Sequence, residues 1–220
     1  MGPMIVTLDG PAGAGKSSTA RALAARLGWC YMDTGAMYRA VALMALDRGI
    51  PLDDSAGLAE LAEAITIEFR DGRVVVDGRD VSTEIRTDRI TQATRPVADA
   101  PPVREAMKRV QRRMAEGMDV VTEGRDQGSV VFPAAALKVF LTASPEERAR
   151  RRHQEEAARG NGVALAEILA AQSQRDEGDR TRAVGAMKPA DDAVIVETDG
   201  LAAEDVVNRL VAMIEERSRS

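Results

Sequence analysis

One short segment near the start of the sequence restricts the fold more than any other. Residues 10–17 are Gly-Pro-Ala-Gly-Ala-Gly-Lys-Ser, which matches the pattern G-x-x-x-x-G-K-[ST] in full. An apolar run rich in β-branched residues, Ile5 to Leu8, precedes this segment, and a helical pattern that ends at Gly28 follows it. The order of strand, glycine loop and helix predicts an α/β fold that opens on a phosphate-binding loop.

The residue types in this loop suit a nucleoside triphosphate. Glycines let backbone N–H groups turn inward around an anion, and the following helix adds the positive end of its dipole. Lys16 supplies a charge to the β- and γ-phosphates, and the Ser17 hydroxyl can bind Mg²⁺. We therefore expect ATP and Mg²⁺ as cofactors, with Ser17 as the metal ligand. The expected ATP-binding residues of the loop are Gly10, Pro11, Ala12, Gly13, Ala14, Gly15, Lys16, Ser17 and Ser18.

The rest of the 220 residues extends the same pattern. Helical periodicity is found at 36–48, 56–64, 102–116 and 203–217, and strand-like runs lie at 119–122, 137–141 and 193–196. Ser144 and Glu147 stand at capping-box spacing before a further helix. These elements predict an α/β P-loop core, in which helices flank a parallel sheet.

The middle of the chain interrupts this alternation. Short strand-like runs there are joined by Asp71-Gly72 and Asp77-Gly78, dipeptides typical of hairpin turns. We interpret residues 60–97 as a small antiparallel β-containing insertion. The core would then take residues 1–59, 98–144 and 183–220, and residues 145–182 would form a helical lid with substrate-contacting helices.

Composition excludes several classes of function. The single Cys30 excludes an internal disulfide and a multi-cysteine zinc site, and the single His153 argues against a His-based triad. The net charge of −5 argues against general nucleic-acid binding, which usually needs a basic excess. No apolar run approaches the ~20 residues of a membrane span. We expect a cytoplasmic monomer that binds neither a nucleic-acid polymer nor a membrane.

The basic residues favour small anions. Only four of the 30 are lysines, so 26 are arginines, whose planar guanidinium binds phosphate or carboxylate with two hydrogen bonds. Genomic composition bias explains the total equally well. The arginines of interest cluster in four places: the segment 33–39, Arg104, the segment 123–126 after a predicted strand, and the segment 175–182. Helix caps, solvated surface arginines and charged helix ends are the plain structural alternatives.

P-loop proteins divide into GTPase switches, ATPase motors and small-molecule kinases. The N-K-x-D tetrapeptide that binds guanine does not occur in the sequence, and Glu123 is a single acidic residue where a motor normally has a pair. Dispersed arginines that can hold a second phosphorylated substrate favour a kinase.

The motifs together resemble the bacterial cytidylate kinase family of nucleoside monophosphate kinases, from about residue 4 to 197. They are the phosphate loop, Asp33-Thr34-Gly35-Ala36-Met37-Tyr38-Arg39, Val103-Arg104-Glu105-Ala106, Gly124-Arg125-Asp126 with Val130-Val131-Phe132-Pro133, and residues 175–184. The resemblance implies a P-loop kinase core and transfer of the γ-phosphoryl group of ATP to CMP or dCMP. It also implies that the insertion 60–97 binds the monophosphate. Two alternatives stay open: a P-loop kinase for another monophosphate such as UMP or AMP, and a non-catalytic ATP-binding regulatory module.

The resemblance also implies roles for single residues. Thr34, Tyr38, Arg39 and Arg125 would hold the phosphate of the monophosphate, Arg104, Asp126 and Arg182 would bind cytosine, and Arg175 with Asp179 would contact the sugar. The expected catalytic residues are Lys16, Arg125, Asp126 and Arg182. In the arginine-rich helix of the lid, Arg148 and Arg152 are expected to contact ATP when the lid closes.

Overall fold

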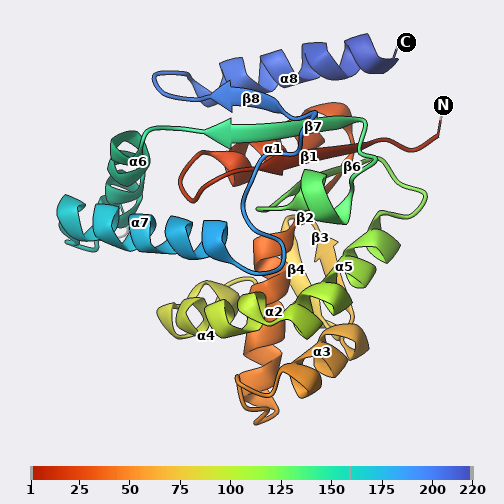
Figure 1. Ribbon diagram of the computed structural model, residues 1–220, viewed down its shortest axis with the longest axis vertical. Helices are drawn as coiled ribbons and strands as arrows, with labels where there is room; N and C mark the ends of the chain where they lie inside the picture. Colours follow the sequence, from red (N-terminus) through yellow and green to blue (C-terminus); the bar gives the residue numbers. More distant parts are fainter. Residues whose placement is uncertain (1, 159, 219–220) are drawn as a thin grey trace. The chain divides into compact units, whose positions relative to one another are not determined.

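The computed structural model describes residues 2–158 and 160–218 (Figure 1). The chain divides into two compact units, Met1–Tyr31 with Met118–Ser220, and Met32–Gly117. We refer to them as the core unit and the middle unit. The boundary between them falls inside strand β2 (Cys30–Asp33).

A five-stranded sheet forms the centre of the core unit, with strand order β2-β6-β1-β7-β8. Strand β1 (Ile5–Asp9) pairs in parallel with β6 (Val120–Glu123) and with β7 (Leu137–Thr142), and β8 (Val194–Glu197) pairs in parallel with β7. A central parallel strand is covered on both faces, which explains the continuous apolar run of β1. The predicted parallel sheet is confirmed.

In the part of the chain that the structure describes, the α-helices of the core unit are α1 (Lys16–Leu27), α6 (Pro145–Ala158), α7 (Leu165–Thr181) and α8 (Ala203–Ser218). Leu23 of α1 and Leu210 of α8 are fully buried in one apolar cluster with the sheet, and Figure 1 shows α8 running beside β8. Helices α6 and α7 pack against each other. The backbone N–H of Glu147 donates to the Ser144 hydroxyl at 3.3 Å, so the predicted start of α6 is confirmed.

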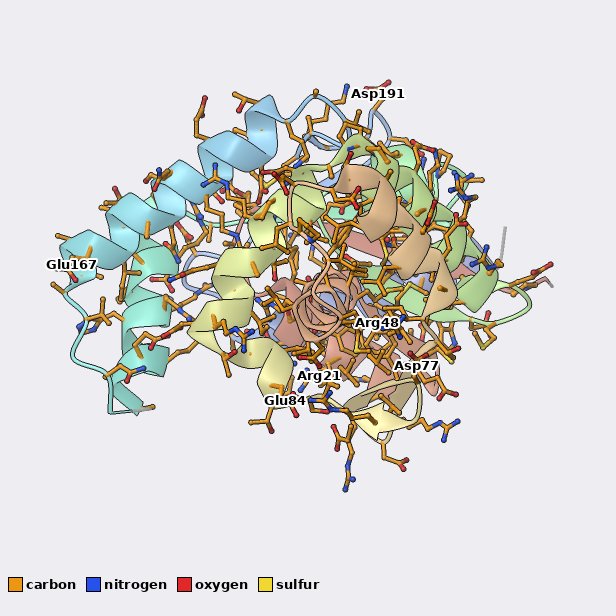
Figure 2. The ribbon with its side chains drawn as sticks, turned by 90° about the horizontal axis from the view of Figure 1, so that it is seen from below. Arg21, Arg48, Asp77, Glu84, Glu167 and Asp191 are labelled. Atoms are coloured by element: carbon orange, nitrogen blue, oxygen red, sulfur yellow. The ribbon has the colours of Figure 1, made fainter. Side chains whose placement is uncertain are left out.

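The middle unit contains the predicted hairpins. Strands β3 (Ile67–Arg70), β4 (Arg73–Val76) and β5 (Arg79–Asp80) form an antiparallel sheet. Both Asp-Gly turns have positive φ at both residues, with values of 50° and 74° at Asp71-Gly72 and 48° and 83° at Asp77-Gly78. Turns of this kind match the right-handed twist of the flanking strands. Asp77 also pairs with Arg48 at 3.0 Å (Figure 2).

Helices make up most of the remaining middle unit: α2 (Thr34–Asp47), α3 (Ser55–Ala64), α4 (Asp88–Asp99) and α5 (Pro101–Ala115), with a 3₁₀ turn η1 (Glu84–Arg86). Helix α4 was not expected inside the 60–97 insertion. It carries Pro96, which usually ends a helix, yet its buried face of Ile90, Ala93 and Val97 has helical spacing. Tertiary packing of this face therefore outweighs the local signal of the proline.

The middle unit is larger than the insertion that the sequence suggests, because it also holds α2, α3 and α5. The functional division into core, insertion and lid stays a prediction. Among the helices that the structure describes, none has the length and apolar character to cross a membrane.

Candidate active site

Three glycines shape the loop between β1 and α1. Gly10, Gly13 and Gly15 have φ values of 139°, 79° and 87°, in the region that L side chains rarely adopt. Gly10 also packs against the sheet, since a Cβ at this position would lie 1.9 Å from the carbonyl oxygen of Leu141. The first turn of α1, Lys-Ser-Ser-Thr, points its backbone N–H groups at the loop. The arrangement is that of an anion cradle.

Lys16 is buried in this cradle, with 5% of its surface exposed. Its Nζ donates to the carbonyl oxygen of Pro11 at 2.7 Å, so the side chain lies back along the loop. Burial first, and then the guanidinium groups of Arg125 and Arg175, lower the pKa of Lys16 to about 7 against the opposing charges of Glu123 and Asp9. The negative charge of a bound polyphosphate would stabilise the protonated form of this desolvated amine and raise its pKa.

Ser17 lies beside the carboxylate of Glu123, which comes from β6, a neighbour of β1 in the sheet. Its Oγ donates to Oε1 of Glu123 at 2.5 Å, and the Tyr31 hydroxyl donates to the same oxygen at 3.4 Å. Glu123 ends β6 and is 6% exposed. A hydroxyl and a carboxylate beside a phosphate cradle are oxygen donors of the type that Mg²⁺ accepts together with substrate phosphates. The residues present therefore fit Mg²⁺.

Arg125, Asp179 and Arg182 form an ion cluster. Arg125 Nε donates to Oδ2 of Asp179 at 2.8 Å, and Arg182 Nη2 donates to Oδ1 at 2.7 Å. Burial alone would raise the pKa of Asp179, but the neighbouring guanidinium groups outweigh it and hold that pKa below its usual range. Three predicted site residues from two distant segments are thus brought together.

Two further predicted residues lie near this cluster. Asp126 is 4% exposed and precedes a π-helical turn, η2 (Gln127–Val131), which sequence patterns did not predict. Arg175 lies on an exposed part of α7, and its guanidinium acts on the pKa values of both Lys16 and Asp179.

The two lid arginines take different positions. Arg148 is 3% exposed, and its Nη1 donates to the carbonyl oxygen of Ala12 at 2.9 Å and to Asp176 at 2.6 Å. It therefore supports the phosphate loop. Arg152 lies on the outer side of α6 and pairs with Glu155 at 3.2 Å and with Glu156 at 2.6 Å. Direct contact of either arginine with ATP stays a prediction.

In the middle unit, the predicted residues come from α2 and α5. Thr34 and Tyr38 are one turn apart on α2, which begins with Asp33 accepting the backbone N–H of Ala36 at 2.8 Å. The guanidinium carbon of Arg104 lies 5.7 Å from the centroid of the Tyr38 ring. Helix α2 also carries Arg39, which is half-buried. These four residues suit a phosphorylated ligand with a polar edge.

Sequence patterns missed several residues that support the loop. Asp176 accepts the backbone N–H of Ala12 at 3.3 Å, and Thr198 donates to the carbonyl oxygen of Ala14 at 3.3 Å. Arg151 donates in turn to the Thr198 hydroxyl at 3.0 Å. These contacts join residues more than 45 positions apart, so no local sequence pattern predicts them. Asp176 could have been proposed from its spacing, because it lies three positions before Asp179 on the same face of α7.

Cytidylate kinases of several bacteria resemble this chain over nearly its whole length. A cytidylate kinase of Rhodopirellula baltica is 51% identical over 213 residues, which cover 97% of this chain and 93% of that protein. A cytidylate kinase of Pelotomaculum thermopropionicum is 48% identical, with 95% of each chain covered.

Solved structures support the fold. A shikimate kinase from Bacteroides thetaiotaomicron has a TM-score of 0.50 at 18% identity, and the match covers 96% of this chain and 98% of that one. An uncharacterized protein from Eubacterium ventriosum has a TM-score of 0.55 at 9% identity with the same coverage. Both show the fold alone. The sequence model of one family, cytidylate kinase, matches residues 6–216, and with the relatives above it shows that this chain belongs to the cytidylate kinase family.

Proposed function

We propose that the protein transfers the γ-phosphoryl group of ATP to CMP or dCMP, giving ADP and CDP or dCDP. Membership of the cytidylate kinase family supports the reaction and makes the chain an ATP-dependent nucleoside monophosphate kinase. Within the core unit, the observation that carries the proposal is a complete phosphate loop together with the Arg125–Asp179–Arg182 cluster. A triphosphate donor and an anionic acceptor both need such groups.

On the donor side, the loop amides and Lys16 bind the β- and γ-phosphates. Phosphoryl transfer needs little covalent participation by the protein, so positioning and charge neutralisation supply most of the rate. Ser17 and Glu123 would hold Mg²⁺, which when bound neutralises charge on the phosphate oxygens. Arg148 and Asp176 stabilise the loop through hydrogen bonds to the backbone of Ala12. Arg152 would reach ATP when the lid closes.

On the acceptor side, the charges of the Arg125–Asp179–Arg182 cluster favour binding of an anion. Arg125 and Arg182 bring two positive charges to the single carboxylate of Asp179, so this cluster keeps a net charge of +1. We assign Thr34, Tyr38, Arg39 and Arg125 to the phosphate of CMP, Arg104, Asp126 and Arg182 to cytosine, and Arg175 with Asp179 to the sugar. Cytosine presents an amino donor beside two acceptors, which a carboxylate and a guanidinium can complement.

We also propose that the chain acts in the cytoplasm as a monomer. Among the described residues, the large apolar side chains that are exposed come from four parts of the chain: Met118, Val163 with Leu165, Ile195, and Leu201. Single exposed apolar residues are normal for a monomer surface.

The reaction is tested by ADP release with ATP, Mg²⁺ and a panel of CMP, dCMP, UMP, AMP, GMP and dTMP. We expect fast turnover with CMP and dCMP only, and loss of turnover when EDTA replaces Mg²⁺, because uncompensated phosphate charge repels the acceptor. Faster turnover with UMP or AMP would leave the phosphate loop assignments intact and refute the cytosine roles of Arg104, Asp126 and Arg182. Failure of every acceptor would favour the regulatory module.

ATP binding should be linked to proton uptake by Lys16. With a pKa of about 7 in the unbound protein, this group is mostly neutral at pH 8, and the phosphates of ATP favour its charged form. The complex then binds more protons than the free protein, so ATP affinity should rise as pH falls from 9 towards 7. Calorimetry in two buffers of different ionisation enthalpy measures the uptake at pH 8. Equal proton uptake by a Lys16→Met variant would contradict the assignment.

A further inference from the structure

Asp9 is the last residue of β1 and stands directly before the phosphate loop. Its side chain is buried, with 5% of the residue exposed, and both carboxylate oxygens accept backbone hydrogen bonds. Oδ1 accepts the N–H of Gln127 and Oδ2 accepts the N–H of Gly128, each at 2.8 Å. These two residues directly follow Asp126. One side chain therefore connects the start of the loop with the segment that carries Arg125 and Asp126.

A second connection lies one residue earlier on the same strand. The backbone N–H of Gly124 donates to the carbonyl oxygen of Leu8 at 3.0 Å. Arg125 and Asp126 therefore lie between two attachments to consecutive residues of β1, at Leu8 and at Asp9. The loop end of β1 is fixed separately, because Gly10 packs closely on Leu141. Of the two attachments, only the one made by Asp9 depends on a side chain.

We propose that Asp9 is a positioning residue for phosphoryl transfer, which sets the backbone of Arg125 and Asp126 relative to the phosphate loop. The proposal rests on the proposed function, since it assigns these two residues to the acceptor. Little room exists for an alternative arrangement of the turn. A Cβ at Gly128 would lie 2.7 Å from Oγ1 of Thr7 and 3.2 Å from Cβ of Lys138.

The contact needs an ionised carboxylate. A protonated carboxyl group would turn one of its oxygens into a donor that faces a backbone N–H. Burial raises the pKa of Asp9 to about 6 against the lowering effect of the two N–H groups; of the charged neighbours, Asp126 raises it and Lys16 lowers it. The positioning should thus be present above pH 6 and be lost below it.

The Asp9→Asn variant tests the proposal. Its amide has one acceptor oxygen for two N–H groups and turns an NH₂ towards the other, so kcat at pH 8 should fall at least about tenfold. The KM for ATP should change less than about threefold, because the loop keeps its own glycine geometry and its contact with β7. The ratio of wild-type to variant kcat should fall towards one between pH 8 and pH 5, and this ratio cancels the titration of the substrate phosphates.

The matched control is Asp192→Asn. Asp192 also accepts two hydrogen bonds through its carboxylate, both from Lys138 at 2.9 Å, but its side chain is 67% exposed. This variant should keep the wild-type kcat at every pH. A wild-type kcat for Asp9→Asn at pH 8, or a kcat ratio that does not change with pH, would overturn the proposal.

A wild-type measurement keeps the proposal testable if Asp9→Asn does not fold. The amide proton shifts of Gln127 and Gly128 should move together as the pH passes through about 6. Constant shifts from pH 5 to pH 8 would refute the role of the ionised carboxylate. Absence of turnover with every acceptor in the wild type would instead refute the proposed function, so the two failures are distinguishable.

Discussion

The Lys16→Met variant should lose about a hundred- to a thousandfold in kcat while it folds at least as well as the wild type. Lys16 is buried in the cradle. In the proposed function, its positive charge stabilises the β- and γ-phosphates of ATP while the γ-phosphoryl group is transferred. A methionine fills a similar volume but offers no positive charge to the transition state. Single-turnover and steady-state kinetics with saturating ATP and CMP measure the loss.

The Lys16→Met substitution should not lower the free energy of unfolding, although it lowers kcat. Burial lowers the pKa of Lys16 below its unfolded value, so between about pH 7 and pH 10.5 the unfolded chain binds more protons than the folded one. The wild type should therefore become more stable as pH rises through that window, and Lys16→Met should lack this rise. Urea unfolding of both proteins at pH 7 and pH 9 separates this effect from the loss of activity.

Lys138 provides the matched control, because it is a second buried lysine in the core unit. It lies on β7, is 8% exposed, and pairs with the exposed carboxylate of Asp192. Lys138→Met should keep kcat within about twofold, since the pair lies outside the proposed catalytic groups. Similar losses of kcat in the two variants would mean that removal of any buried lysine disturbs the fold, and that the phosphate role of Lys16 is wrong.

The parts of the molecule that sequence predicted well are those with local causes. The phosphate loop depends on glycines at fixed spacing, and the two hairpins depend on Asp-Gly pairs that tolerate positive φ. Helix α4 was missed because Pro96 is a local signal against a helix, and burial of Ile90 and Val97 outweighs it. The π-helical turn η2 was missed for the related reason that no residue period marks it.

Site residues divide in the same way. Lys16 and Ser17 follow from the loop pattern alone, whereas the roles of Arg125, Asp179 and Arg182 came from family resemblance. Their meeting in one cluster is a tertiary fact, because 54 positions separate Arg125 from Asp179. Arg148 shows the limit of resemblance most clearly. Its guanidinium is bound to the loop carbonyl of Ala12 and to Asp176, contacts that no motif specifies.

The Asp179→Ala variant should lower kcat/KM for CMP by about a hundredfold or more, because it leaves two largely buried guanidinium groups without their shared carboxylate. The side chains of Arg125 and Arg182 are 17% and 9% exposed, so water replaces the lost partner poorly. The affinity for ATP should stay nearly unchanged, since the phosphate loop keeps its own contacts with Arg148 and Asp176. Kinetics with varied CMP, and ATP titration by calorimetry, measure the two effects.

A change in ATP affinity as large as the change in kcat/KM would show that the cluster supports the loop rather than the acceptor. Asp192→Ala is the control, because it removes an exposed carboxylate from a lysine of the same unit and should leave both quantities at wild-type values. Stability offers an independent check. Since the pKa of Asp179 is held low in the folded state, its contribution to stability should be present at neutral pH and be lost as pH falls below about 4.

A double-mutant cycle with Arg182→Met distinguishes two roles of Asp179: holding Arg182 in place and contacting the sugar directly. If Asp179 works by holding Arg182 in place, the double variant should be little worse in kcat/KM for CMP than the more damaged single variant, because both remove the same arrangement. If Asp179 instead contacts the sugar directly, the two losses should add, and Asp179→Ala alone should change the ratio of kcat/KM for CMP to that for dCMP. We expect both contacts to act: the 2.7 Å hydrogen bond to Arg182 predicts losses that do not fully add, and the sugar assignment predicts a changed ratio of kcat/KM for CMP to that for dCMP. An additive cycle with an unchanged CMP to dCMP ratio would refute both.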